Sequence, residues 1–474
     1  KQRGISVSST VLSFEFDGFH VNLLDTPGHQ DFSEDTYRTL MAADCAVMVI
    51  DLAKGIEQQT EKLFRVCALR GIPVITFVNK VDRAGQEPLA ILAEIESKLG
   101  IEAIPLNWPI GMGRDFVGVV DLPSRMAQLF DDRRGDRRVA FRSQSLDALS
   151  DDDVTDTVRQ RTRDEVHLLE AAGAPFDSHR FLEGAITPVF FGSALTNFGV
   201  EHFLQGFLRL CPPPTDRPSD RGLISATCSE FSGFVFKIQA NLDPRHRDRV
   251  AFVRVCSGRF QREMEVLHPR SGKKLRLNRA HRVFGQDRET VEEAFPGDIV
   301  GLVNPGEFRL GDTLCQRQPF HFDALPQFSP EHFAVIRCRD TARRKQFERG
   351  LQQLIEEGAV QMFHEPHARR REPILGAVGE LQFDVVRFRL ESEYNTETLI
   401  ERLPFELARW IDLPPDELRA LQLPYGSAIV EDQHAHAAIL FKSRWEAEYY
   451  QRQNPNLNLA TMRTDSGSHE RQRS

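Results

Sequence analysis

Three short polar segments each follow directly on an apolar run, where a buried strand is expected to end. The run before the first of them, residues 21–24, is typical of such a strand. The carboxyl ends of parallel strands meet at one edge of a sheet, where open α/β folds bind their ligands. We therefore expect the three segments to come together in space. They are Asp25-Thr26-Pro27-Gly28-His29, Asn79-Lys80-Val81-Asp82 and Ser193-Ala194-Leu195.

Phosphoryl transfer requires positioned phosphates, a metal ion and an aligned nucleophile. The first segment offers one residue for each of these requirements. The carboxylate of Asp25 can hold Mg²⁺, usually through water. Gly28 has no side chain, so its backbone N–H can approach a terminal phosphate closely. His29 can orient an attacking water molecule. Near the start of the chain, Ser6 of Arg3-Gly4-Ile5-Ser6 offers a hydroxyl that could ligate Mg²⁺ from a mobile segment closing on the γ-phosphate.

The second and third segments have the pattern expected around guanine. Guanine presents two adjacent donors, N1–H and the exocyclic amine, and the carboxylate of Asp82 can accept both. Adenine lacks this pair, so an unpaired buried carboxylate would penalise ATP. Asn79 can bridge the loops around the base, the stem of Lys80 can lie along its face, and the backbone N–H of Ala194 is placed to donate to O6. These features predict GTP or GDP as the ligand.

Each segment alone also has an ordinary structural explanation. Asp-Thr-Pro-Gly makes a good turn, and an isolated Asn-Lys-x-Asp match is often a surface loop. Ser-Ala-Leu and Arg-Gly-Ile-Ser carry little information by themselves. Their joint occurrence in this order, with three of them at strand ends, is poorly explained by coincidence and favours a nucleotide site.

Length and composition limit the class of protein. A chain of 474 residues is too long for one core, so we expect about two to four domains. The net charge is −9, so a nucleic-acid partner would have to be met by local basic patches. The 7 cysteines are scattered without a C-x-x-C pair, which indicates reduced thiols in a cytoplasmic protein rather than disulfides or zinc. No apolar run approaches the roughly 20 residues of a membrane-spanning helix.

The elements that position the three segments alternate between strands and helices over residues 1–214. Continuous apolar runs at 45–51, 72–80 and 186–195 predict buried strands, with amphipathic helices between them. This alternation indicates a parallel α/β sheet. Residues 211–221 then predict a linker, because prolines fit neither a helix interior nor a central strand.

Two further domains are expected after the linker. Short strand-like runs between glycine and proline turns predict a small β-barrel over 222–320. From 328 to 460, the order strand, helix, strand, strand, helix, strand is the split βαβ, or ferredoxin-like, α+β pattern. Residues 461–474 have almost no apolar side chains and are expected to be disordered. The predicted fold class is multidomain α/β plus β.

The four motifs together resemble those of the translational GTPases. Arg3 to Ser6, Asp25 to His29, Asn79 to Asp82 and Ser193 to Leu195 are similar to that family's switch I, switch II, base-specificity and guanine-loop motifs. The resemblance covers nearly the whole chain up to about Leu403. Longer strings resemble the bacterial termination factors of the family, namely "VNLLDTPGHQDFSEDTYRTL", "ITPVFFGSALTNFGVEHF" and "GFVFKIQANLDPRHRDRVAF".

The resemblance implies a GTPase that uses Mg²⁺, docks on the terminating ribosome through rRNA and ribosomal proteins, and speeds departure of the release factor that read the stop codon. His29 matches the family's catalytic histidine, and Ser6 stands where most relatives carry a threonine. We also expect a cytoplasmic monomer with neither DNA nor a membrane as partner.

The family's phosphate loop, G-x-x-x-x-G-K-[ST], is expected before Arg3 and does not occur in the sequence. In such P-loop-type domains, the strand feeding that loop lies between the strand ending at Asp25 and the strand ending at Asp51. We therefore expect the printed sequence to be an N-terminally incomplete form whose first domain folds poorly and binds GTP weakly. The functional assignment is made for the protein with its phosphate loop.

Two other functions stay open at this point. A translocase like elongation factor G would continue with two large domains, and about seventy residues after Leu403 are too few for both. A non-hydrolysing nucleotide-binding remnant is the other alternative. His29 argues against it, because binding alone needs no residue that orients water.

Overall fold

The computed structural model describes residues 8–130, 141–240, 249–284, 287–303, 306–325, 327–366 and 372–463. These residues form two compact units. We call residues 15–19 and 43–213 the sheet unit, and residues 8–14, 20–42 and 214–463 the barrel unit. Arg3-Gly4-Ile5-Ser6, with its predicted magnesium ligand, and the segment beyond Arg463 lie outside the described residues.

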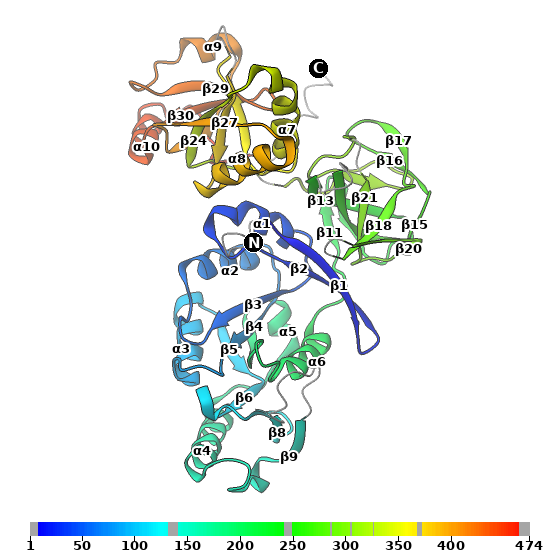
Figure 1. Cartoon of the computed structure of the whole chain (residues 1–474), viewed down its shortest axis with the longest axis vertical. Coiled ribbons are helices and arrows are strands. Elements are labelled where there is room, and N and C mark those ends of the chain that lie inside the picture. Colours follow the sequence, from blue (N-terminus) through cyan, green and yellow to red (C-terminus); the bar gives the residue numbers. More distant parts are fainter. Residues whose placement is uncertain are drawn as a thin grey trace. The chain divides into compact units, whose positions relative to one another are not determined.

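A four-stranded parallel sheet lies at the centre of the sheet unit (Figure 1). β4 and β10 are its inner strands and are almost wholly buried, as expected for continuous apolar runs in a sheet covered by helices. All neighbouring strands are parallel, as predicted. The order is β3 (Ala46–Asp51), β4 (Val74–Asn79), β10 (Ile186–Phe191) and β5 (Glu102–Pro105).

Helices contribute to two separate hydrophobic cores of this sheet. Ile91 and Ile95 of α3 pack in one core with Val78 of β4. Phe181 of α5 packs in the other core with Phe190 of β10. The helices are α2 (Gln58–Leu69), α3 (Pro88–Leu99), α5 (Ser178–Leu182) and α6 (Val200–Leu210).

A second, antiparallel sheet was not predicted from the sequence. It carries α4 (Asp156–Ala172) against β6, where the indole N–H of Trp108 donates to Glu165 Oε2 at 2.8 Å. Its strands are only four or five residues long, so each gives a short sequence pattern. They are β6 (Asn107–Ile110), β7 (Gly118–Asp121), β8 (Met126–Phe130) and β9 (Phe141–Ser145), in that order.

The strand that precedes Thr26 differs from the prediction. β2 (Phe19–Asp25) pairs with β1 (Thr10–Phe16) across a tight turn in which both Asp17 and Gly18 have positive φ. Among the described residues, β1 is the only strand that pairs with β2, so Leu23 is 43% exposed and the predicted buried strand is wrong. β2 is also not part of the parallel sheet that contains β4 and β10. The expectation that all three polar segments end strands of one parallel sheet is therefore wrong.

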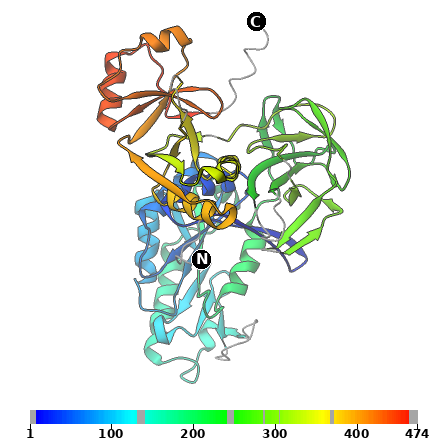
Figure 2. The ribbon, with the colours of Figure 1, turned by 45° about the horizontal axis from the view of Figure 1, so that its top comes forward.

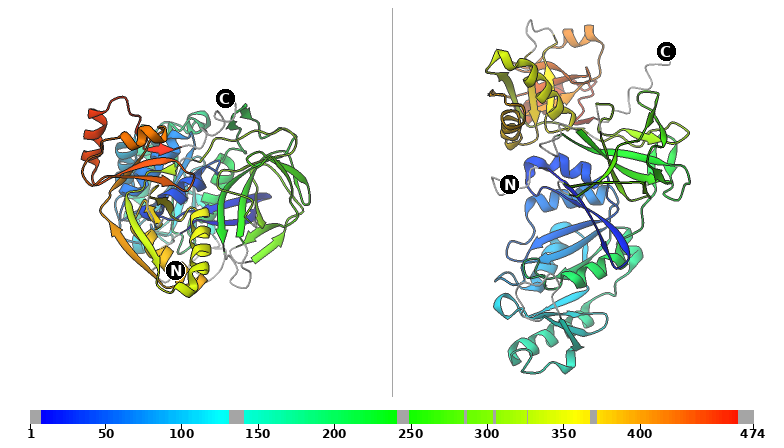
Figure 3. Two further views of the ribbon diagram at one scale, coloured as in Figure 1. Left: turned by 90° about the horizontal axis from the view of Figure 1, so that it is seen from above. Right: turned by 45° about the vertical axis from the view of Figure 1, so that its right-hand side comes forward.

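The barrel unit contains an antiparallel β domain, drawn in green in Figure 3. Its central strands pair along most of their length and bury Val235, Val253 and Leu314 in one core. A short pair, β11 (Arg217–Ser219) and β12 (Gly222–Ile224), precedes it. The main sheet has the order β17 (Lys273–Arg276), β16 (Glu265–His268), β22 (Thr313–Cys315), β13 (Ser232–Ala240), β14 (Arg249–Ser257), β21 (Ile299–Val303), β18 (Ala280–Phe284) and β19 (Asp287–Thr290), beside a small pair of β15 (Phe260–Gln261) and β20 (Glu293–Ala294).

The third domain has the predicted ferredoxin-like chain order. Its helices α7 and α8 pack against each other beside the sheet (Figure 2). The strand order β27-β24-β26-β25 is that of a split βαβ unit. In chain order the elements are β24 (His332–Cys338), α7 (Arg344–Glu356), β25 (Gln361–His364), β26 (Ile374–Ala377), α8 (Leu381–Tyr394) and β27 (Thr398–Leu403).

Three more strands extend this sheet from the edge of β25, which the sequence did not predict. They are accompanied by α9 and α10 and form a core of their own around Ile439 and Phe441. β31 (Met462–Arg463), at the start of the segment predicted to be disordered, pairs with β23 (Gln327–Phe328). The added elements are β28 (Leu407–Trp410), α9 (Pro415–Ala420), β29 (Ala428–Asp432), β30 (Ala437–Phe441) and α10 (Arg444–Gln453).

None of the helices that the structure describes is long and apolar enough to cross a membrane. All seven cysteines are free thiols, as the scattered spacing predicted.

Candidate functional site

The loops after β4 and β10 meet in the sheet unit, as the sequence predicted for these two segments. Asn79 joins them, because its Oδ1 accepts the backbone N–H of Lys80 at 2.8 Å and that of Ala194 at 2.9 Å. A backbone hydrogen bond from Val81 N–H to Gly192 O, 3.2 Å long, adds a second link. The two loops therefore form one structure at the carboxyl edge of the parallel sheet.

This arrangement corrects the role expected of Ala194. Its N–H is already donated to Asn79 and is not turned to an open site. The side chain of Ser193 is fully buried, and its Oγ accepts the N–H of Thr196 at 3.4 Å. Val81 is fully buried in the core, whereas Leu195 is 73% exposed. Val81 and Ser193 thus shape the loops through packing and a local turn.

Asp82 carries an unsatisfied acceptor in the same loop cluster. Its Oδ1 is buried and has no hydrogen-bond partner among the residues that the structure describes. A buried acceptor without a partner is unfavourable unless a ligand supplies the donor. The adjacent N–H donors of guanine fit this requirement, so the residues present agree with a guanine ligand.

A residue that the sequence analysis missed holds Lys80 in place. The Lys80 backbone is left-handed, with φ 67°, and its Nζ lies 2.6 Å from Oδ2 of Asp51 at the end of β3. This hydrogen bond is the main cause that lowers the pKa of the Asp51 carboxyl below its usual value. The apolar run ending in Asp51 was noted as a strand, and its terminal carboxylate was the available signal.

The segment Asp25 to His29 lies in the barrel unit, as the connection from β2 to the short helix η1 (Gln30–Phe32). Asp25 and Gly28 are exposed, and a Cβ atom built on Gly28 would meet no protein atom within 4 Å. Pro27 is buried, and its carbonyl accepts the Thr36 hydroxyl at 3.1 Å. The segment is therefore anchored at Pro27, with Thr26 partly buried before it, and has open space at Gly28.

His29 caps η1 through its ring. Nδ1 lies 3.3 Å from the backbone N of Asp31 and 3.2 Å from Oδ1 of the same residue. The side chain is 36% exposed, and its ring lies 6.1 Å from that of Phe32. Nδ1 is thus engaged by the protein, while the side chain as a whole remains partly exposed.

A magnesium ion would be held here mainly by a nucleotide. Among the described residues, no group of three or more His, Cys, Asp or Glu side chains could hold a metal. Mg²⁺ commonly takes one or two protein oxygens together with phosphate oxygens and water. The single exposed carboxylate of Asp25 at the end of β2 fits that pattern.

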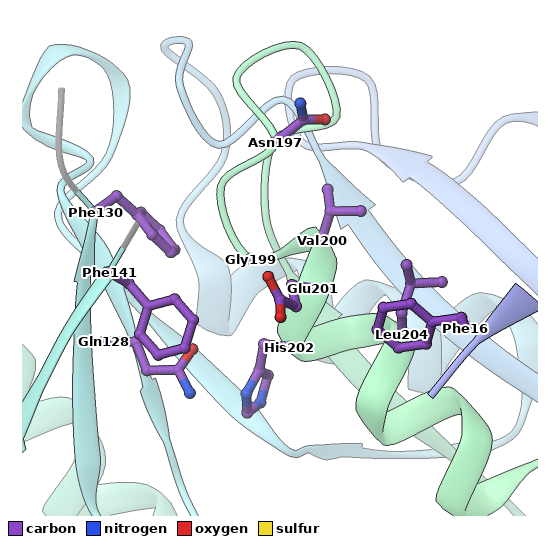
Figure 4. A pocket seen from close by; sticks show the side chains of 10 residues that line it. All are labelled: Phe16, Gln128, Phe130, Phe141, Asn197, Gly199, Val200, Glu201, His202 and Leu204. Atoms are coloured by element: carbon purple, nitrogen blue, oxygen red, sulfur yellow. The ribbon is translucent and has the colours of Figure 1, made fainter. Parts of the chain in front are cut away.

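A pocket of about 150 Å³ in the sheet unit does not belong to these loops (Figure 4). It is lined mainly by apolar and aromatic side chains of β8, β9 and α6, with Phe130 and Phe141 on one side and Leu204 on another. Burial lowers the pKa of His202 in its wall. The pocket contains none of the predicted nucleotide-binding residues.

Comparison with known proteins agrees with a translational GTPase fold. Family models match three successive parts of the chain: elongation factor Tu GTP binding domain over residues 1–213, elongation factor G domain 2 over 230–317, and class II release factor RF3, C-terminal domain, over 322–451. A crystal structure of a protein from Thermus thermophilus has the same fold, with a TM-score of 0.67 and 21% identity, covering 91% of this chain and 64% of that one.

Closely similar relatives identify the family. The peptide chain release factor 3 of Gloeobacter violaceus is 53% identical, and that of Symbiobacterium thermophilum is 50% identical. Each comparison covers 96% of this chain and 87% of the relative. The chain belongs to the peptide chain release factor 3 family. The alternative of a translocase like elongation factor G is not favoured.

Proposed function

We propose that this protein is a GTP-hydrolysing translation termination factor, which acts on the ribosome and promotes departure of the release factors that read stop codons. The observation that supports the ligand is the loop cluster bridged by Asn79, with the unpaired buried oxygen of Asp82 beside it. Membership of the release factor 3 family supports the place of action.

Base selection follows from the chemistry of Asp82. Its carboxylate accepts N1–H and the exocyclic amine of guanine, whereas adenine would leave the buried oxygen unpaired. Asn79 holds the two loops at a fixed separation, because its single oxygen accepts a backbone donor from each. Lys80, held by Asp51, presents its methylene stem to the base.

Hydrolysis depends on the segment in the barrel unit. His29 orients the attacking water, and the N–H of Gly28 approaches the terminal phosphate in the space that a side chain would fill. Asp25 and Ser6 would hold Mg²⁺, which when bound neutralises charge on the phosphates. The α- and β-phosphates would be cradled by the family's phosphate loop.

The proposed partners are the ribosome, through rRNA and ribosomal proteins, and the stop-codon-reading release factors. The protein is proposed to act as a monomer in the cytoplasm, with no DNA partner. The domain limits proposed for it are 1–214, 222–320 and 328–460, followed by the tail 461–474.

Replacement of the histidine tests the catalytic assignment. In a chain extended with the family's phosphate loop, we expect His29→Ala to keep its nucleotide affinity within about twofold, because the ring does not contact the base. Ribosome-stimulated hydrolysis should fall by about two to four orders of magnitude. Hydrolysis at the wild-type rate would contradict the role of His29.

A further inference from the structure

Asp31 connects the proposed catalytic histidine to a helix of the barrel unit that is distant in the sequence but adjacent in space. The residue is buried, with 7% of its surface exposed, and its two carboxylate oxygens face different partners. Oδ1 lies 3.2 Å from Nδ1 of His29, and Oδ2 accepts the backbone N–H of Leu381 at 2.8 Å. Leu381 is the first residue of α8 in the ferredoxin-like domain.

The N-terminus of α8 has need of such an acceptor. Its own N-cap residue, Glu380, makes no side-chain capping hydrogen bond. The first N–H groups of a helix lack partners within the helix and favour a nearby anion. Asp31 supplies both an acceptor and a negative charge at that end, so α8 in turn fixes the position of the Asp31 carboxylate.

A glycine permits this close approach. A Cβ atom on Gly379 would overlap the Asp31 carboxylate and would lie 2.5 Å from Asp31 Cα. Gly379 has no positive φ that would itself require glycine. Close contact with Asp31 is therefore the physical reason for a glycine at this position.

A second contact joins the same segment to α7, the other helix of the ferredoxin-like domain. Arg38 of α1 (Ser33–Leu40) is 6% exposed and donates to the carbonyls of Glu357 at 3.3 Å and Gly358 at 2.9 Å. These carbonyls lie at the C-terminal end of α7, where a cation is favoured. The segment from Asp31 to Arg38 thus carries an anion to the start of one helix and a cation to the end of another.

We propose that Asp31 is a positioning residue for His29, held in place by the N-terminus of α8. The inference rests on the proposed role of His29 in hydrolysis. Both protonation forms of the ring find a partner at Nδ1, because the neutral ring accepts the Asp31 N–H and the charged ring donates to Oδ1. Fixing Nδ1 fixes the ring plane and leaves Nε2 as the atom that meets water.

Asp31→Asn tests the proposal in a chain extended with the phosphate loop. The variant keeps an oxygen that can accept the Leu381 N–H, but it loses the negative charge that lies beside Nδ1 of His29. We expect single-turnover, ribosome-stimulated hydrolysis to fall by about tenfold to a hundredfold, as misplacement of a catalytic group does. The dissociation constant for GDP should stay within about twofold, since Asp31 is not at the base-binding loops.

A double-mutant cycle separates positioning from general loosening of the structure. In the His29→Ala background, Asp31→Asn should lower hydrolysis by less than about twofold further, because the ring it positions is gone. If the fold-loss of hydrolysis in the double mutant equals the product of the two single-mutant losses, the two residues act independently and the proposal is wrong. Asp384→Asn is the matched control: it removes a carboxylate from the first turn of α8 that pairs with Arg387, and it should leave hydrolysis within about twofold.

A spectroscopic measurement covers the case in which Asp31→Asn folds poorly. With ¹⁵N-labelled histidine, the signal of His29, assigned by its loss in His29→Ala, should report a single ring tautomer, because Asp31 holds Nδ1 in one environment. Gly379→Ala pushes α8 away without altering either side chain, and it should produce a mixture of tautomers. An unchanged single tautomer in that variant would contradict the link through α8. If His29→Ala itself hydrolyses GTP normally, the proposed function fails, whereas normal hydrolysis in Asp31→Asn alone removes only the positioning role.

Discussion

At the scale of single residues, the proposed base recognition depends on one amide and one carboxylate. Asn79 uses its oxygen to accept two backbone donors, so its contribution is to hold the two loops together. Asp82 has a buried oxygen without a hydrogen-bond partner among the described residues, which makes it the proposed acceptor for a ligand with two donors.

Replacing Asp82 tests this division of roles. Asp82→Asn, in a chain extended with the phosphate loop, should weaken GTP binding by about tenfold to a hundredfold, because hydrogen bonds to a charged acceptor are lost. The same variant should bind xanthosine nucleotides better, since the asparagine amide can donate to the C2 carbonyl of xanthine. Displacement of a fluorescent nucleotide measures both affinities, and an unchanged affinity for GTP would exclude Asp82 from base recognition.

The sequence predicted the types of these residues better than their partners. Asn79 was expected to bridge the loops, and it does. The N–H of Ala194 was expected to face the base, but it is used by Asn79. Asp51 and Asp31 were missed, because a carboxylate becomes informative only when the fold places Lys80 or His29 beside it.

At the scale of elements, α6 packs closely against β10, which leads to the loop of Ser193. Gly206 lies on the buried face of α6, and a Cβ atom there would overlap the ring of Phe190. Alanine improves helix propensity by about 1 kcal/mol over glycine. Overpacking of a tight core costs about 1–3 kcal/mol, so steric overlap should prevail.

Gly206→Ala should therefore lower the free energy of unfolding by up to about 2 kcal/mol. The exposed neighbour Gln205 offers a matched control, because Gln205→Ala should change stability by less than about 0.5 kcal/mol. Urea unfolding followed by circular dichroism measures both. Stabilisation by Gly206→Ala would mean that helix propensity outweighs packing at this position.

Elements with strong local patterns were predicted well. β4 and β10 are continuous apolar runs and are buried as expected. β2 was predicted to be buried because its residues are apolar, but burial depends on neighbouring strands, and only β1 pairs with it in the part of the chain that the structure describes. The sheet of β6–β9 and the extension from β28 to β30 were missed, because short strands with mixed composition resemble loops.

At the scale of the whole molecule, the β domain contains a buried charge that links stability to pH. Asp312 is 5% exposed; its side chain is 2.6 Å from Arg270 Nε and 2.9 Å from His268 Nε2. Burial opposes ionisation of Asp312, but its hydrogen bonds with Arg270 and His268 outweigh burial, so its pKa lies below the usual value of 3.8. A lowered carboxyl pKa gives stability that is present above the unfolded pKa and lost as pH falls through the folded one.

The free energy of unfolding of the wild type should therefore decrease as the pH falls below about 4. Asp312→Asn should be less stable at pH 7, because Arg270 and His268 lose their ionised partner, and its stability should decline less steeply below about pH 4. Urea midpoints between pH 7 and pH 3 measure the two slopes. Parallel slopes for the two proteins would exclude Asp312 as the source of the acid sensitivity.

In the proposed function, this protein uses GTP to release a stop-codon-reading factor from the ribosome. The most direct measurement follows a fluorescently labelled release factor as it leaves a terminated ribosome, in the presence of a chain to which a phosphate loop of the family has been added. We expect departure to be faster with GTP than without nucleotide, and no faster with ATP than without nucleotide. Departure at the same rate with and without GTP would contradict the assignment.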